Sequence, residues 1–106
     1  MRRGIWNTKK KYKNTPEERE KMWNFFLEIW KERPHYCQIT GKWLGNQPKS
    51  WHFDHLLEKS KYPELAFEKD NIILVDFEVH ELKTNGFPLP KHRELIEQAK
   101  QKFLNK

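Results

Sequence analysis

The sequence predicts a small α+β domain, and three observations support this. Amphipathic helical patterns stand near both ends of the chain, and two apolar segments between them have the length of β-strands. The chain has 106 residues, which is room for one domain. Aromatic residues make up 14% of it and supply apolar surface for a modest core. We therefore expect residues 15–106 to form a single domain.

A basic arm, residues 1–14, precedes this domain. It holds six basic residues and no acidic one, while the other fifteen basic residues equal the fifteen acidic ones in number. Two aromatic residues, Trp6 and Tyr12, lie among the charges, which suits contacts to phosphates with occasional stacking on bases. We expect the arm to bind nucleic acid; the alternative is a solvated tail. Its basic residues are Arg2, Arg3, Lys9, Lys10, Lys11 and Lys13.

The first predicted helix begins after Thr15. Threonine is a good N-cap, proline is favoured in the first turn, and a glutamate follows three residues after the cap. We expect the helix to run to about Arg33, just before Pro34. Its apolar residues recur at spacings of three and four and are assigned to the core. They are Met22, Trp23, Phe26, Leu27, Ile29 and Trp30.

Short extended elements are expected in the middle of the chain. A hairpin is predicted around the turn at residues 40–42. A strand rich in aromatic residues follows at 50–57, and a second strand at 71–75. Between them, residues 58–70 hold a proline and many charges and are expected to be irregular.

Two helices are predicted to complete the domain. Asp76 is a good N-cap for a helix from Phe77 to about Asn85, and Gly86 is a natural stop. The last helix is expected over roughly Lys91–Leu104, where apolar residues again recur on one face.

Cysteine content and hydropathy limit the functional classes. The single cysteine, Cys37, cannot form an internal disulfide, and without a CxxC pair the chain offers no structural zinc knuckle. We expect Cys37 to be buried and the protein to reside in a reducing compartment. There is no apolar run of membrane-spanning length and no signal peptide, so we expect no membrane partner and a cytoplasmic location.

Polar residues in the middle of the chain predict metal-assisted hydrolysis of a phosphodiester. Asp54 is a suitable hard ligand for Mg²⁺ or Mn²⁺, and the adjacent His55 can accept a proton near neutral pH. His80 lies near the start of its helix, where partial positive charge favours a phosphate. Lys83 follows on about the same helix face, within reach of that phosphate.

Strand geometry leaves one alternative ligand open. In a regular strand Asp54 and His55 point to opposite faces, whereas His52 shares the face of Asp54. The pair can serve one phosphate only if the strand ends or bends at His55, and His52 is the rival ligand. Nothing singles out the remaining candidates near the site or elsewhere: Glu58, Glu78, His35, and His92, which we expect to be solvated on the last helix.

Residues 36–86 resemble the HNH nuclease family of phage and homing type, whose catalytic unit is a ββα-metal fold. The resemblance rests on the Asp54–His55 pair, Asn71 before two isoleucines, and His80 followed by a Lys-Thr pair. It implies Asp54 and His80 as metal ligands and His55 as the general base. It also implies that Asn71 braces the intervening loop and thereby orients His55.

The resemblance further implies a DNA endonuclease that uses one divalent metal, Mg²⁺ or Mn²⁺, and leaves 5′-phosphate and 3′-hydroxyl ends. A monomer or weak dimer with one site per chain should nick duplex DNA. Many family members carry CxxC pairs that bind structural zinc; here we expect Trp43, Trp51 and the two long helices to replace that support. The glycine pair common in the family's loop is also missing.

Two alternatives remain open. The protein could be a basic DNA-binding accessory to phage packaging or recombination proteins, with an idle HNH site. With either function, the expected location is the cytoplasm of a bacterium or an infected host. The protein could instead carry a purely structural metal site. That site would draw its ligands from His52, Asp54, His55 or His80.

Overall fold

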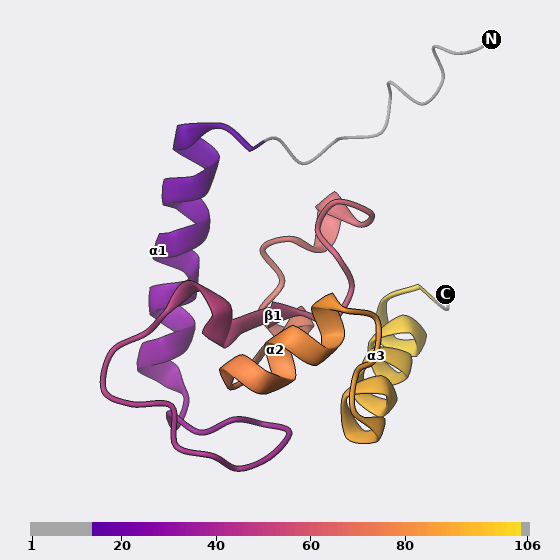
Figure 1. Cartoon of the computed structure of the whole chain (residues 1–106). Helices are drawn as coiled ribbons and strands as arrows, with labels where there is room; N and C mark the ends of the chain where they lie inside the picture. The colour runs from indigo at the N-terminus through magenta and orange to yellow at the C-terminus, as the bar shows by residue number, and fades with distance from the viewer. Residues whose placement is uncertain (1–13, 105–106) are drawn as a thin grey trace, which may run out of the picture.

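The structure, a computed structural model, describes residues 14–104. In this range the chain has the predicted α+β architecture, with three α-helices and a two-stranded antiparallel sheet (Figure 1). The predicted nucleic-acid-binding residues of the arm lie outside the described residues: Arg2, Arg3, Lys9, Lys10, Lys11 and Lys13.

The first helix, α1, spans Pro16–Glu32, close to its predicted bounds. The predicted cap is confirmed, because the Thr15 hydroxyl accepts a hydrogen bond from the backbone N–H of Glu18 at 3.1 Å. The helix buries most of the stripe that its sequence pattern indicates, namely Met22, Phe26, Ile29 and Trp30. The assignment of Trp23 to the core is wrong, because its side chain is 36% exposed at the edge of the stripe. The ring of Phe26 lies parallel to that of Phe53 with centroids 4.4 Å apart. This contact places α1 against the sheet.

Both strands are shorter than predicted. β1 is Phe53–His55 and β2 is Ile72–Leu74, paired so that Asp54 lies opposite Ile73. The residues that precede each strand, 50–52 and 69–71, form 3₁₀ turns instead of extended chain. Backbone bonds still continue the pairing past the strands, from Val75 to His52 and from Leu56 to Asn71.

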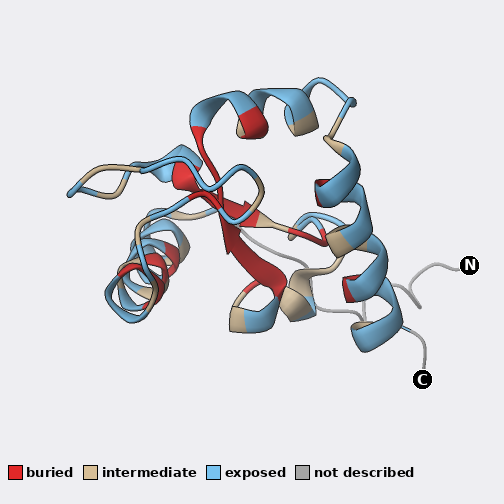
Figure 2. Ribbon diagram, turned by 90° about the horizontal axis from the view of Figure 1, so that it is seen from below, coloured by how far each residue is buried: buried red, intermediate tan, exposed pale blue. Residues whose placement is uncertain are grey.

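The two-stranded sheet of β1 and β2 separates two apolar clusters, one on each of its faces. Phe53, Ile72 and Leu74 pack with α1, whereas Ile73 and Val75 pack toward the C-terminal helices. This is the alternation expected of strands buried on both sides. Figure 2 shows that the strands form the buried centre of the molecule, with exposed residues on the outer faces of the helices.

The C-terminal helices are α2, Phe77–Thr84, and α3, Pro90–Phe103, both close to prediction. The predicted Asp76 cap is confirmed: its carboxylate accepts from the Val79 N–H at 2.9 Å and from the Thr40 hydroxyl at 2.8 Å. Gly86, which follows α2, has a φ of +90°, a conformation that favours glycine. None of the helices described between residues 14 and 104 is long and apolar enough to cross a membrane.

The predicted hairpin at residues 40–42 is only a single bridge, between Tyr36 and Trp43, closed by a turn at Gly41. The prediction that Trp43 and Trp51 support the core is wrong. Their side chains are 52% and 36% exposed. They pair instead with other surface rings, Trp43 with Tyr36 and Trp51 with Phe77, so neither fills the interior. Cys37 is buried, as expected.

Arg33, at the end of α1, ties the helix to the second strand. Its guanidinium donates to the backbone carbonyls of Ile72 at 2.6 Å and Lys69 at 2.9 Å, and to the Gln38 side chain at 3.1 Å. Burial is the largest influence on its pKa, which is lowered, while the nearby carboxylates of Glu32 and Asp70 act in the opposite direction. Arg33 thus connects α1 with the segment around Gln38 and with the second strand. Within the described chain no disulfide links these segments.

We expect Arg33→Met to lower the free energy of unfolding by about 2–3 kcal/mol, because charged donors are lost while the apolar stem remains. Urea denaturation followed by tryptophan fluorescence measures this. Lys31→Met, at an exposed position of the same turn, is the control and should change little. Equal effects of the two substitutions would contradict the role given to Arg33.

Candidate active site

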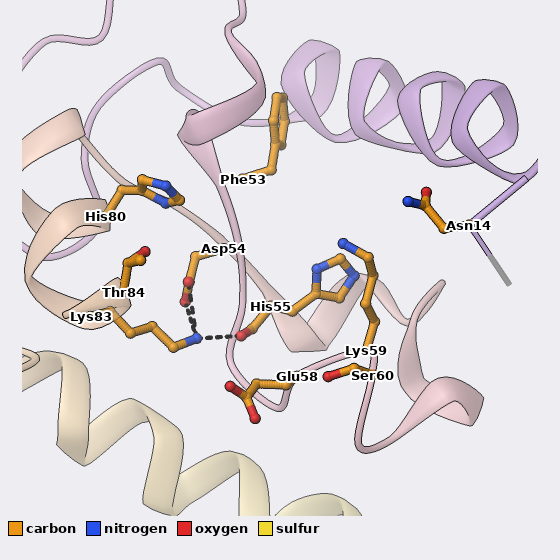
Figure 3. Close-up of a pocket in the computed structure, with 10 residues that line it drawn as sticks. All are labelled: Asn14, Phe53, Asp54, His55, Glu58, Lys59, Ser60, His80, Lys83 and Thr84. Atoms are coloured by element: carbon orange, nitrogen blue, oxygen red, sulfur yellow. Dashed lines mark hydrogen bonds and ion pairs between the residues drawn. The ribbon is translucent and has the colours of Figure 1, made fainter. Parts of the chain in front are cut away.

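A cleft of about 590 Å³ lies where β1, α2 and the loop after β1 meet (Figure 3). Three of the residues predicted to carry the chemistry, Asp54, His55 and His80, line this one cleft. So does Lys83, the predicted phosphate contact. The remaining lining residues are Asn14, Phe53, Glu58, Lys59, Ser60 and Thr84.

Asp54 lines the cleft with a buried carboxylate and is 7% exposed. The Lys83 ammonium lies 2.9 and 3.0 Å from its two oxygens and also donates to the backbone carbonyl of His55. On the other side, Nε2 of His92 lies 2.8 Å from Oδ2 of Asp54. Residues from two helices therefore contact this one side chain. Without such partners, burying its charge would cost free energy of folding.

The expectation that His92 is solvated is wrong, because its side chain is completely buried. Sequence reasoning missed it although a signal was present. His92 lies three, four and seven residues before Leu95, Ile96 and Ala99, so it belongs to the apolar face of α3. The helical pattern alone indicates that His92 is buried, but it does not identify Asp54 as its partner.

His55 projects from the opposite face of β1, as strand alternation requires. Its ring lies near Phe26 of α1, with centroids 5.8 Å apart, and its Nε2 is 2.9 Å from the carbonyl oxygen of Ala66. A carbonyl only accepts, so Nε2 carries the proton and Nδ1 has the lone pair. Both residues reach one cleft because β1 ends at His55.

The pKa of His55 is lowered from its ordinary value, chiefly because burial disfavours the charged ring. The Ala66 carbonyl and the Asp54 carboxylate raise the pKa, and the charges of Lys59 and Lys83 lower it further. The net shift keeps the imidazole neutral at neutral pH. A neutral ring with Nδ1 as acceptor is the form that a general base requires.

Asn71 is completely buried and braces the loop that follows β1. Its amide accepts from the Leu57 N–H at 2.9 Å, and donates to the carbonyls of Leu57 at 3.0 Å and Leu65 at 3.3 Å. Leu65 is adjacent to Ala66, whose carbonyl holds the His55 ring. The contacts support the bracing role that the resemblance implies for Asn71.

His80 reaches the cleft from near the start of α2, the helix whose N-cap is Asp76. The side chain is half-buried, and within the described chain its imidazole has no hydrogen-bond partner. Figure 3 shows it on the same side of β1 as Asp54 and Lys83, away from the His55 ring. Its one ring contact within residues 14–104 is with Phe77, with centroids 6.5 Å apart, so it can bind a ligand without first losing a hydrogen bond to the described chain.

Asp54 and His80 are two residues of the cleft that could hold a largely hydrated divalent ion. Within residues 14–104 no three His, Cys, Asp or Glu side chains cluster closely enough to hold a metal among themselves. One carboxylate and one imidazole leave the other coordination positions to water and phosphate, an arrangement that Mg²⁺ accepts readily. The fit has one condition: Lys83 already supplies a positive charge to Asp54 and must withdraw when an ion binds.

His52, the rival ligand, lies elsewhere. It belongs to a 3₁₀ turn and not to β1, so the period-two argument that placed it beside Asp54 does not apply. Its Nδ1 accepts from the Lys49 N–H at 3.0 Å, and its ring stacks on Trp30 at 5.5 Å. It is absent from the lining of the cleft.

No family model, curated protein or solved structure matches this chain.

The protein should lose stability as the pH falls below about 6.5, the ordinary histidine pKa. The folded-state pKa values of His55 and His52 are both lowered, mainly by burial, so protons bind the unfolded chain first. The loss therefore begins near the unfolded-state pKa and continues through the lower folded-state values. Melting temperatures measured between about pH 7.5 and 5 test this, and His55→Gln should make the decline shallower. A pH-independent melting temperature would contradict the buried, neutral state of these rings.

Proposed function

We propose that the protein is a metal-dependent endonuclease that nicks DNA with an HNH-type, ββα-metal site. The observation that carries this proposal is that Asp54, His80 and a neutral His55 line one cleft. The resemblance to HNH nucleases anticipates these three residues. The strand–strand–helix order of β1, β2 and α2 is consistent with that catalytic unit.

His55 is the general base of the proposed reaction. With Nε2 committed to the Ala66 carbonyl, Nδ1 is left to take a proton from the attacking water. The water oxygen forms a bond to phosphorus as the bond to the 3′ oxygen breaks. Asn71 contributes indirectly, because it holds the loop that carries Ala66.

Asp54 and His80 are the proposed ligands of one Mg²⁺ or Mn²⁺ ion. Such an ion, when bound, stabilises negative charge on the phosphate and on the departing oxygen. The chain brings these donors from two different elements, β1 and α2. The relative position of Asp54 and His80 therefore depends on how α2 packs on the sheet formed by β1 and β2.

Lys83 has two proposed positions. Without a metal it neutralises Asp54, as the structure describes. When Asp54 takes a metal, the lysine ammonium is freed at the wall of the same cleft, where a phosphate is its natural partner. The predicted phosphate contact then belongs to the metal-bound protein.

DNA is the proposed substrate. Asn14, which immediately follows the last basic residue of the arm, lines the cleft, so the arm joins the domain at the site itself. Contacts from lysine and arginine would then be made mainly to phosphates, without reading sequence. One site makes one cut, and the expected product is a nick with 5′-phosphate and 3′-hydroxyl ends.

One observation favours the second candidate, a DNA-binding accessory protein with an idle site. The Asp54 carboxylate is already paired with both Lys83 and His92, so the described structure is electrostatically satisfied without a metal. An idle site would bind DNA and leave it intact under all metal conditions.

The nuclease proposal predicts nicking of supercoiled plasmid with Mg²⁺ or Mn²⁺, and none with EDTA. His55→Ala should slow nicking by about 10²–10⁴-fold while the fold is retained, because it removes a general base. Agarose-gel time courses measure the rate, and circular dichroism checks the fold. His35→Ala, which removes a histidine outside the cleft, is the control. Undiminished nicking by His55→Ala would rule out the mechanism, and DNA binding without nicking by the parent protein would favour the idle site.

Lys83→Met should separate metal binding from catalysis. Removing the ammonium that competes for Asp54 should tighten Mn²⁺ binding by about tenfold or more, since such charge-assisted contacts are worth about 1.5–3 kcal/mol. Nicking should nevertheless slow, because the phosphate loses a cation. Calorimetric titration and the plasmid assay measure the two effects. The exposed Lys91→Met is the control of equal charge. Weaker Mn²⁺ binding by Lys83→Met would contradict the competition.

A further inference from the structure

Within residues 14–104, the His92 side chain has one polar contact, which is with the proposed metal ligand Asp54. The imidazole is completely buried in α3, outside the segment 36–86 that resembles a nuclease. Its Nε2 lies 2.8 Å from Oδ2 of Asp54. Its Nδ1 is buried without a hydrogen-bond partner among the described residues.

The contact with Asp54 fixes which nitrogen of the His92 ring is the hydrogen-bond donor. A carboxylate accepts, so Nε2 carries the proton and donates it to Asp54. His92 therefore acts on Asp54 as a hydrogen-bond donor. Among the described residues, the bond to Asp54 is the only polar interaction that the imidazole provides, whereas an apolar residue would fill the same position without an unpaired nitrogen.

The two partners of Asp54 differ in freedom. His92 is enclosed by the core and has few alternative positions, whereas Lys83 is a long side chain at the wall of the cleft. When Lys83 withdraws, the bond from His92 remains. Lys83 contacts both oxygens and His92 contacts only Oδ2, so after that withdrawal His92 still binds Oδ2 while Oδ1 is left available at the cleft.

We propose that His92 is a positioning residue that orients the Asp54 carboxylate for metal binding, an inference that rests on the proposed function. Outer-shell partners of this kind typically contribute 10–100-fold in metal affinity. The last helix, which the nuclease resemblance leaves unexplained, is then part of the metal site.

Mn²⁺ titration of three His92 variants tests the proposal. His92→Leu removes the donor and keeps apolar bulk, and it should weaken Mn²⁺ binding by about 10–100-fold. His92→Gln places an amide N–H near the position of Nε2 and should restore binding. His92→Asn reaches only to the position of Nδ1 and should bind as weakly as His92→Leu. Isothermal titration calorimetry with Mn²⁺ alone gives the affinities, and melting temperatures show whether each variant is folded.

Two results would overturn the proposal: parental Mn²⁺ affinity in His92→Leu, or equal weakness of the glutamine and leucine variants, which would reduce His92 to packing. If His92→Leu fails to fold, the comparison of glutamine with asparagine decides. A parent protein that binds Mn²⁺ without cutting DNA would refute the nuclease and leave this comparison valid. A parent protein that binds no Mn²⁺ would refute both.

Discussion

The pairing of the buried Asp54 carboxylate with Lys83 and His92 is the interaction on which the rest of the structure depends. A charge in this position is tolerated only because α2 supplies Lys83 and α3 supplies His92. Both C-terminal helices are thereby tied to the middle of β1, in addition to their apolar packing. The same pairing keeps the carboxylate ready for a cation, because one of its two partners is itself a cation on a long side chain.

The alternation of β1 divides the proposed chemistry between two environments. Asp54 faces the C-terminal helices with His80, Lys83 and His92, where charges are paired. His55 faces α1 and the loop braced by Asn71, where burial keeps the imidazole neutral. The end of the strand at His55 lets both faces open into one cleft. The proposed metal ligand Asp54 and the proposed base His55 are thus adjacent in sequence but lie in different electrostatic environments.

Much of this architecture was predictable from local sequence signals. Thr15 and Asp76 mark helix starts by their side-chain chemistry alone, and the structure confirms both caps. Asp54, His55 and His80 were selected by residue type and spacing, and they do line one cleft. Turns were harder: residues 50–52 form a 3₁₀ turn in which His52 stacks on Trp30 of α1, so the strand periodicity that made His52 a rival ligand does not apply.

Contacts between distant segments were not predictable. The partners of Asp54 lie 29 and 38 residues away, and no local pattern identifies which buried group a histidine or lysine will meet. The exposure of Trp43 and Trp51 has the same origin, because aromatic content does not specify which rings the core has room for. Residues 1–13 of the arm lie outside the described residues, so its proposed contact with DNA rests on its charge and on the position of Asn14 at the cleft.

A crystal structure of the protein soaked with Mn²⁺, with the ion located by its anomalous scattering, tests the central claim most directly. The account predicts one ion between the Asp54 carboxylate and the His80 imidazole, with the Lys83 ammonium displaced from Asp54 and His92 still bonded to it. An ion bound elsewhere, or Lys83 still on Asp54 with no ion in the cleft at saturating Mn²⁺, would contradict it.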